Sequence, residues 1–303
     1  MPAMMSTDAQ HRPSAPSAAV TIRPMTAQDA EACGKVAFAA HQAVSALHNV
    51  PSEHPSEEFS IGMMTFKLRD PHADGLVAER EGSVVGSVFL TGFPPTPVAA
   101  VGPLTVHPAA EGKVGRQLME AALERARERR FDGVRLVQSP GHIRSLVLYT
   151  KLGFDAREPL LLVHGSPPGV PIGKKRVRPA VPEDVTACNQ LCLAIHGLQR
   201  ESQLRAAIEQ RVATVVEEGG CISGYAAGIG LLGHAVAETT NDLKALISQA
   251  TTIPRPGFFV PTRNGELLRW LLGAGFRGVW PATLMTIGRY QEPTGAFLPA
   301  ISF

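Results

Sequence analysis

The sequence predicts a mixed α/β fold in the form of two tandem copies of one layered domain. From residue 20 to about residue 163, short apolar runs alternate with segments of helical periodicity, which is typical of a sheet covered by helices. Residues 22–33 (IRPMTAQDAEAC) match residues 177–188 (VRPAVPEDVTAC), so the pattern is repeated. The 303 residues are 44% apolar and 18% charged, which suits well-filled cores and excludes a wholly disordered chain.

Two further matches keep the same order along the chain. Residues 77–86 match residues 215–224, and LGF at 152–154 matches AGF at 274–276, with an offset that shrinks toward the C-terminus. The second copy is therefore the shorter one. Residues 165–173 (GSPPGVPIG) are rich in proline and glycine, as a linker is. We predict a loose tail at 1–19, a first domain at 20–165, a linker at 166–174 and a second domain at 175–303.

The first copy is predicted to alternate strands with helices. The strands are expected at 20–23, 76–79, 84–90, 98–106, 134–137 and 160–163. The helices are expected at 27–40, 56–69, 114–129 and 144–152. Thr26 precedes the first helix as an N-cap, Glu81 and Gly82 form the turn of a hairpin, and Gly153 ends the last helix.

The helix expected at 114–129 is amphipathic. Its apolar residues recur at helical spacing, at Leu118, Met119, Ala122, Leu123 and Ala126. Glu124 and Arg127 are spaced to pair on its outer face.

The loop before this helix has the features of an anion-binding site. The stretch VHPAAEGKVGRQLM, residues 106–119, leads from a strand into the helix and carries two glycines. The first N–H groups of a helix have no internal partner, and the helix dipole adds positive potential there. The residues that fit this geometry are Gly112, Lys113, Val114, Gly115 and Arg116. On the loop alone, an ordinary helix start is the favoured explanation of the glycines.

The surroundings of the loop resemble a known family. Val106-x-Pro108, the glycine loop, the strand at 134–137 and then LYTKLGF at 148–154 come in one order at one spacing. This order resembles the GNAT acetyltransferase superfamily, whose domains end in such a helix. The resemblance covers residues 20–163 well and follows the same plan faintly over 175–288, so the chain resembles a tandem GNAT protein.

The resemblance implies a position for acetyl-CoA, between splayed parallel strands at 98–106 and 134–137. Its pyrophosphate would lie on the helix start, and main-chain groups of the first strand would bind the pantetheine arm and thioester. Tyr149 matches the family tyrosine that gives a proton to the departing thiolate, although a core aromatic on an amphipathic helix is the alternative. The cofactor-binding residues implied are Leu104, Thr105, Val106, Glu111, Gly112, Lys113, Val114, Gly115, Arg116, His142 and Ser145.

Three positions depart from the family pattern. Glu111 stands where a basic or amide residue is usual, and a glutamate repels a pyrophosphate. His142 stands where the family often has asparagine. The strand at 98–106 lacks the glutamate that many members use as a base, and Gly102-Pro103 predicts a bulge there. The base is then a water, His107 or a residue elsewhere.

The second copy lacks these features of a cofactor site. Its counterpart of the loop has no glycine at the turn and offers Glu238 and Asp242, acids that cap a helix and exclude phosphate. Trp270 lies near where a tyrosine is expected. We predict that this copy binds no CoA and completes the sheet or substrate cleft of the first, and that the apolar end of the chain, residues 296–303, is ordered.

Two histidines match between the copies on their first helices, His41 and His196. In the family the region after the first helix lines the acceptor cleft, so His41 is a candidate substrate contact. A half-buried structural position explains the repeated histidine more simply.

Charge and cysteine content exclude several classes of partner. With 29 basic and 27 acidic residues, the chain gives no reason to expect nucleic acid or an anionic membrane. No apolar run is long enough to span a bilayer, and residues 1–19 lack the pattern of a secretory signal, so we expect a cytoplasmic protein. Cys188 and Cys192 are four apart, but with no third ligand nearby we expect buried apolar cysteines and no metal.

The function predicted is an N-acetyltransferase with one active site, in the first domain. It moves an acetyl group from acetyl-CoA to an amine of a small molecule or peptide by direct attack, without a metal. A non-catalytic acyl-CoA-binding module is one alternative, and a purely structural pair of domains is another. The sequence does not specify the acceptor amine, the general base or the oligomeric state.

Overall fold

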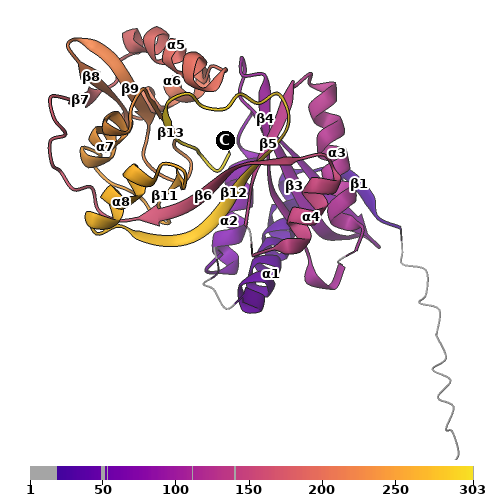
Figure 1. Cartoon of the computed structure of the whole chain (residues 1–303). Helices are drawn as coiled ribbons and strands as arrows, with labels where there is room; N and C mark the ends of the chain where they lie inside the picture. Colours follow the sequence, from indigo (N-terminus) through magenta and orange to yellow (C-terminus); the bar gives the residue numbers. More distant parts are fainter. Residues whose placement is uncertain (1–18, 49–51, 53, 111, 140, 303) are drawn as a thin grey trace, which may run out of the picture.

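The computed structural model of the chain describes residues 19–48, 52, 54–110, 112–139 and 141–302. It has an eight-stranded sheet in the order β1-β2-β3-β4-β5-β12-β6-β11 and a five-stranded sheet in the order β13-β10-β9-β8-β7. In Figure 1 the N-terminal half lies on the right and the C-terminal half on the left. The mixed α/β fold predicted from the sequence is confirmed.

The N-terminal half has the strands and helices predicted for it. They are β1 (Thr21–Pro24), α1 (Ala30–His48), α2 (Glu57–Leu68), β2 (Ala73–Arg80), β3 (Ser83–Gly92), β4 (Val98–Val106), α3 (Val114–Glu128), β5 (Gly133–Gln138), α4 (Ile143–Lys151) and β6 (Asp155–His164). The largest difference is in α1, which continues to His48 because no glycine or proline interrupts residues 41–48. Glu81 and Gly82 form the predicted turn, both with positive φ (52° and 73°) as a type I′ hairpin requires.

The C-terminal half follows the same plan with shorter elements. They are β7 (Arg176–Pro179), α5 (Val185–His196), α6 (Glu201–Glu209), β8 (Ala213–Glu218), β9 (Cys221–Ala227), β10 (Ala235–Ala237), α7 (Thr240–Ser248), β11 (Phe258–Pro261), α8 (Gly265–Gly273), β12 (Arg277–Gly288) and β13 (Ala296–Leu298). Single-turn 3₁₀ helices precede α1, α3 and α5, at Ala27–Asp29, Pro108–Ala110 and Pro182–Asp184. At the end of the chain, residues 296–298 form the buried strand β13, as the prediction of an ordered end requires, and Phe303 lies outside the described residues.

The two copies of the sequence repeat also share the same hydrogen bonds between an arginine on the first strand and two carboxylates. Arg23 on β1 bonds Asp29 at 2.8 Å and Glu79 at 2.9 Å, and the Asp29 carboxylate accepts the N–H of Thr26 at 2.7 Å. The second half has the same arrangement in Arg178, Asp184, Glu217 and Val181. The two copies therefore fix their first strand and first helix in one way.

The two halves share the large sheet. β12, from the C-terminal half, lies between β5 and β6 and is antiparallel to both. β6, from the N-terminal half, lies in turn between β12 and β11. Figure 1 shows β6 and β12 as long ribbons that run from one half to the other. The second half thus completes the sheet of the first, as we predicted.

Helices cover both faces of the sheet in the N-terminal half. Val88 and Leu90 of β3 pack in the cluster that holds α3, whereas Phe89 packs with α1 and α2, because successive side chains of a strand point to opposite faces. α1 and α2 therefore lie on one face, and α3 and α4 on the other. The strands β6, β11 and β12 of the eight-stranded sheet pack against α5. The cluster between them includes Cys188 and Cys192, which are buried as predicted.

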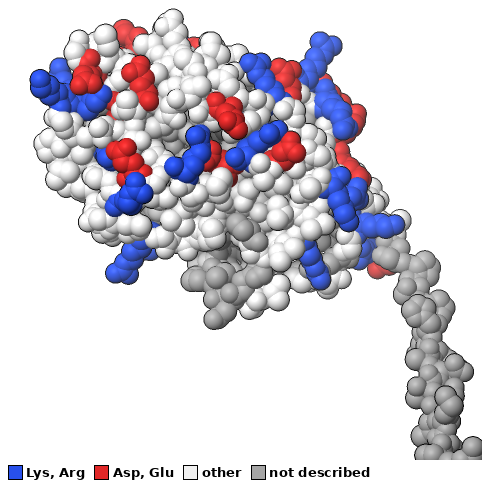
Figure 2. Space-filling view, in the orientation of Figure 1, with Lys and Arg blue, Asp and Glu red and all other residues white. Residues whose placement is uncertain are grey.

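Within the part of the chain that the structure describes, no helix combines the length and apolarity needed to cross a bilayer. No cluster of three or more metal-ligating side chains occurs among the same residues. On the face seen in Figure 2, positive and negative side chains are interspersed and do not gather into a patch of one sign.

Candidate functional site

The strands β4 and β5 are parallel and splayed. They pair at Val98–Gly133, Ala99–Val134 and Ala100–Arg135, and no further pair follows among the described residues. The C-terminal ends of the two strands therefore leave a gap in the sheet, as the sequence led us to expect.

A bulge in β4 marks the point where the gap begins. The pairing of β4 with β3 shifts register between Val88 and Leu90, so that Gly102 and Pro103 lie opposite the single residue Phe89. Gly102 has φ of +139°, a conformation that favours glycine. The bulge predicted at Gly102-Pro103 is confirmed.

One hydrogen bond shows which way the main-chain N–H and C=O groups of β4 point beyond the bulge. The N–H of His107 bonds the carbonyl of Val85 on β3 at 2.9 Å. Because main-chain groups alternate sides along a strand, Thr105 also faces β3, whereas Leu104 and Val106 face the gap. The Thr105 hydroxyl is buried and bonded to Ser87 at 2.9 Å. The main-chain donors available to a ligand in the gap are those of Leu104 and Val106.

The helix α3 begins beside this gap. Gly112 has φ of +122°, which again favours glycine, Lys113 is exposed, and Val114 is buried as the first helical residue. The N–H of Gln117 bonds the carbonyl of Lys113 at 3.0 Å, so earlier amides lie in the first turn, where a helix leaves N–H groups without an intrahelical acceptor. Glu111, which the sequence placed in the site, lies outside the described residues.

Gly115 lies where β4, α3 and α4 converge. A Cβ added to it would be 3.7 Å from the side chains of Val106 and Leu148, which is ordinary contact distance. The fold therefore does not itself require glycine at this position, but side-chain atoms beyond Cβ would crowd Val106, Leu148 and Leu104. Arg116, next in the helix, bonds Glu120 at 3.0 Å and is 42% exposed in its side chain.

His142 and Ser145 form the start of α4. His142 is the N-cap residue, and its carbonyl accepts the Ser145 hydroxyl at 2.8 Å. The buried Gln138 at the end of β5 donates its side-chain amide to the Ser145 hydroxyl at 3.2 Å. These bonds tie the end of β5 to the first turn of α4 and fix the wall of the gap opposite β4.

Tyr149 lies one turn after Ser145 on the same face of α4. Its ring packs in the cluster beneath α3, with its centroid 6.0 Å from that of Phe154. Burial raises the pKa of Tyr149 to about 12, so the hydroxyl keeps its proton at neutral pH. A proton donor must be in this state.

Two histidines beside the N-terminal part of α2 form a stacked pair that sequence reasoning missed. The rings of His41 and His54 lie 3.8 Å apart, nearly parallel. The Ser60 hydroxyl donates to the Ser56 carbonyl at 3.1 Å, so it accepts from Nδ1 of His54 at 2.8 Å. Burial lowers the pKa of His54, and it lowers that of His41 to about 3, with smaller effects of His54 and His142. Both rings are neutral at pH 7, and no spacing rule in the sequence signals their contact.

His107, a candidate base, has a local role in the structure. Its Nδ1 accepts the N–H of Ala109 at 3.2 Å within the turn before α3. His196, the counterpart of His41, is buried against the ring of Phe297. The structural interpretation of the repeated histidine is therefore the better one for the second half.

In the second half, the chain itself occupies the space between β10 and β11. β13 pairs antiparallel with β10, with Phe297 opposite Val236, and it also contacts β11. β10 and β11 belong to different sheets, so they are separated like the open ends of β4 and β5. Phe297 and Leu298 are buried. The space in the second half that corresponds to the β4–β5 gap is thus filled by β13.

The helix start in the second half is closed as well. Asp242 is fully buried, accepts the N–H of Thr239 at 3.1 Å and the Ser223 hydroxyl at 2.6 Å, and pairs with Lys175 at 2.8 Å. The acid predicted at this helix start is confirmed, and it satisfies donors that an anion would need. The counterpart of Tyr149 is Leu271, which accepts the N–H of Phe276 as Tyr149 accepts that of Phe154. Trp270, the expected counterpart, is one residue away.

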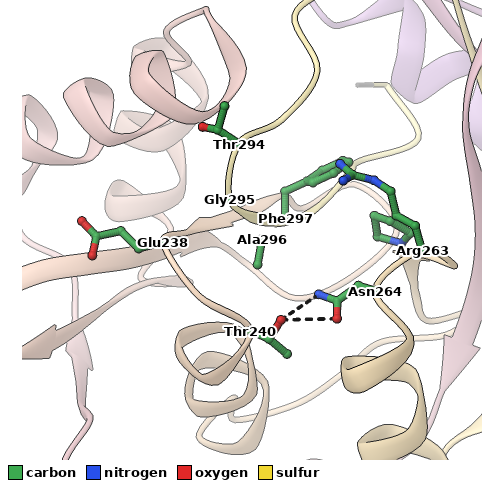
Figure 3. A pocket seen from close by; sticks show the side chains of 9 residues that line it. Glu238, Thr240, Arg263, Asn264, Thr294, Gly295, Ala296 and Phe297 are labelled. Atoms are coloured by element: carbon green, nitrogen blue, oxygen red, sulfur yellow. Dashed lines mark hydrogen bonds between the residues drawn. The ribbon is translucent and has the colours of Figure 1, made fainter.

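A cavity of about 300 Å³ remains beside β13 (Figure 3). It is lined by Glu238, Thr240, Pro261, Arg263, Asn264, Thr294, Gly295, Ala296 and Phe297. Asn264 caps α8 and bonds Thr240, and Arg263 is held by the buried Glu158 at 2.7 Å. None of these residues belongs to the predicted site. The open gap, the glycine loop and the half-buried Tyr149 occur together in the N-terminal half, which therefore holds the candidate site.

Comparison with known proteins finds a family match in the N-terminal half. Residues 41–154 match the acetyltransferase (GNAT) family. The matched segment includes β4, α3 and α4. No curated protein matches the chain.

Solved structures extend the likeness to the whole chain. A putative acetyltransferase from Pyrococcus horikoshii has 18% identity and a TM-score of 0.67, over 93% of this chain and 94% of that one. A GCN5-related N-acetyltransferase from Sphaerobacter thermophilus has 13% identity and a TM-score of 0.61, over 91% and 98%. A tandem GNAT protein from the clavulanic acid biosynthesis pathway has 16% identity and a TM-score of 0.53, over 89% and 98%. The chain has the fold of a tandem GNAT protein.

Proposed function

We propose that the chain transfers an acetyl group from acetyl-CoA to an amine of a small molecule or peptide, at one site in the N-terminal half. The observation that carries this proposal is the convergence of the β4–β5 gap, the start of α3 and the half-buried Tyr149. The match of residues 41–154 to the GNAT family supports acetyl-CoA as the acetyl donor, since the family uses acetyl-CoA.

In the proposed complex, the pyrophosphate lies on the amides at the start of α3, near Gly112, Gly115 and Arg116. The pantetheine arm extends along β4 and pairs with the main chain of Val106 and Leu104. The thioester carbonyl then meets a fixed N–H donor near the bulge, which stabilises the oxyanion formed on attack.

The reaction needs no covalent enzyme intermediate. A neutral amine attacks the thioester carbon, a C–N bond forms, and the C–S bond breaks. Tyr149 protonates the departing thiolate and regains its proton from solvent, while the new ammonium loses one proton to water or to a base. Because the pKa of Tyr149 is raised, the residue enters each cycle protonated.

We propose a single site for the chain because the described part of the second half has no open gap, no free helix start and no tyrosine at these positions. β13 takes the place of a pantetheine arm beside β10, Asp242 occupies the helix start, and Leu271 has no proton to donate. We infer that the second half binds no acetyl-CoA and instead supplies β12 to the sheet.

A non-catalytic acyl-CoA-binding module is the second candidate. The observation that favours it is the absence of any carboxylate on β4, residues 98–106, where many GNAT enzymes place a base. Binding and turnover separate the two candidates from a purely structural pair.

The test combines calorimetric titration of acetyl-CoA with thiol release across a panel of amines. The enzyme hypothesis predicts saturable binding and amine-dependent release of CoA. Binding without release with any amine supports the module. If no heat appears at millimolar cofactor, both proposals are wrong.

A further inference from the structure

The amine of Lys67 lies at the bulge of β4. Lys67 is on α2, and its Nζ donates a hydrogen bond to the carbonyl of Gly102 at 3.2 Å. The same nitrogen lies 5.6 Å from the ring centroid of Phe89, the residue opposite the bulge. The side chain therefore reaches the sheet on the face covered by α1 and α2, at the point where β4 separates from β5.

This point is the inner end of the gap. β4 and β5 pair up to Ala100, and Gly102 follows directly. A cofactor whose pyrophosphate lies at the start of α3 places its acyl group at the far end of the arm. From Val106 back to Gly102 the strand covers about 13 Å, at roughly 3.3 Å per residue. The thioester would therefore lie next to the residues that Lys67 contacts.

The chemistry of Lys67 suits a nucleophile. Burial lowers its pKa, while the nearby Asp70 acts weakly in the opposite direction. Among the described residues, no carboxylate forms an ion pair with its amine. No acidic partner among the described residues therefore holds this amine in its charged form, and the neutral form of an amine is the one that attacks a thioester.

Resting on the proposed function, we propose that Lys67 is an internal acceptor, acetylated in cis by acetyl-CoA bound in the β4–β5 gap. The Nζ lone pair forms a bond to the acetyl carbon as the C–S bond breaks. The departing thiolate takes a proton from Tyr149, and the nitrogen loses one proton to solvent. The product is Nε-acetyl-lysine, which has no charge and keeps one N–H for the Gly102 carbonyl.

The chain contains internal standards for the test. Of its seven lysines, Lys35 is half exposed on α1 and reports non-enzymatic acetylation. The full chain is incubated with acetyl-CoA carrying a deuterated acetyl group, without an amine, and label at each lysine is followed by peptide mass spectrometry. We expect the initial rate at Lys67 to exceed that at Lys35 by at least about tenfold, because the cofactor presents the thioester locally. The fraction labelled per unit time should not depend on protein concentration.

Two controls separate site-directed from random acetylation. Excess CoA should abolish label at Lys67, and the variant Gly115→Leu should reduce it by about tenfold at subsaturating acetyl-CoA. Both should leave label at Lys35 unchanged. The variant Lys67→Arg keeps a donor for Gly102 and should remove only that peptide's label. Equal melting temperatures for the variants and the parent show that the fold is retained.

The possible failures are distinguishable. If acetyl-CoA binds and amines are acetylated, but Lys67 is labelled no faster than Lys35, the inference about Lys67 is wrong and the proposed function stands. If acetyl-CoA does not bind, the proposed function fails and the inference fails with it. Rapid label at Lys67 that CoA does not suppress also contradicts the inference.

Discussion

At the scale of single residues, the proposed chemistry depends on groups held in one protonation state by burial. Tyr149 stays protonated because the charged phenolate is disfavoured among the apolar side chains beneath α3. His41 and His54 stay neutral for the same reason. Sequence reasoning found the tyrosine by its motif. It missed the contact of the two histidines, because His54 lies between α1 and α2, in a segment whose path no local sequence pattern specifies.

Replacing Tyr149 with Phe removes the hydroxyl and keeps the packing of the ring. We expect kcat to fall by roughly 10²-fold, as for loss of a general acid, while the Kd for acetyl-CoA changes little. In the parent, activity should not decline through loss of the Tyr149 proton until the pH approaches 12. Steady-state kinetics and calorimetry check this, and equal losses in kcat and affinity would count against the role of Tyr149.

The repeated arginine–carboxylate contacts predict a loss of stability in acid. Arg23 holds the pKa of Asp29 below its usual range, and Arg178 does the same for Asp184. A carboxyl whose folded pKa is lowered stabilises the protein above the unfolded value of about 4, and this contribution is lost as pH falls through the folded value.

Melting temperatures between pH 7 and pH 2 test this prediction. Arg23→Met and Arg178→Met should each be less stable than the parent at pH 7, and the difference should shrink below about pH 4. Arg127→Met removes an exposed pair and should follow the parent. A difference that stays constant with pH would mean that the carboxylates do not contribute through these pairs.

At the scale of elements, the same strand–loop–helix unit leaves an open gap in the first half and a filled one in the second. In the first half, β4 and β5 end in an open gap and α3 begins with glycines. In the second half, β13 fills the corresponding gap and Asp242 caps the helix start. The acidic cap was readable in the sequence, since caps are local. The position of β13 was not, because it depends on pairing across about 60 residues, which no local pattern specifies.

The filling of this gap predicts a large cost for truncating Phe297. Its side chain is 3% exposed, and Phe297→Ala should lower the free energy of unfolding by about 3–5 kcal/mol. Leu232→Ala, at a residue 66% exposed, is the control and should cost less than about 0.5 kcal/mol. Denaturant unfolding measures both, and similar small losses would show that β13 is not a fixed part of the second half.

At the scale of the whole molecule, the halves are joined by reciprocal strand exchange. The sequence predicted the fold class, the repeat and most elements, because these follow from local periodicity and punctuation. It did not predict that β12 would separate β5 from β6, since both halves carry the same pattern and pairing within each half satisfies that pattern equally well. The proposed domain boundary at 166–174 falls between β6 and β7, so it divides the repeat but not the shared sheet.

Strand exchange predicts that the first half does not fold alone. A fragment of residues 1–165 lacks β12, which leaves β5 with an open edge and β6 without either neighbour. We expect this fragment to aggregate or to unfold without cooperativity, and co-expression with residues 166–303 to restore a soluble complex. Circular dichroism and thermal melting decide the question, and a cooperative transition of the isolated fragment would contradict the prediction.

In the proposed complex acetyl-CoA lies in the gap beside Gly115, and one titration tests this position most directly. Calorimetry of acetyl-CoA with the parent, Gly115→Leu and the matched control Gly273→Leu, an exposed helix position with nothing within 4 Å of its Cβ, compares the three affinities. We predict saturable binding to the parent and the control. Gly115→Leu should weaken it by at least about tenfold, or about 1.4 kcal/mol. Equal affinity of all three proteins, or no binding to the parent, would contradict the account.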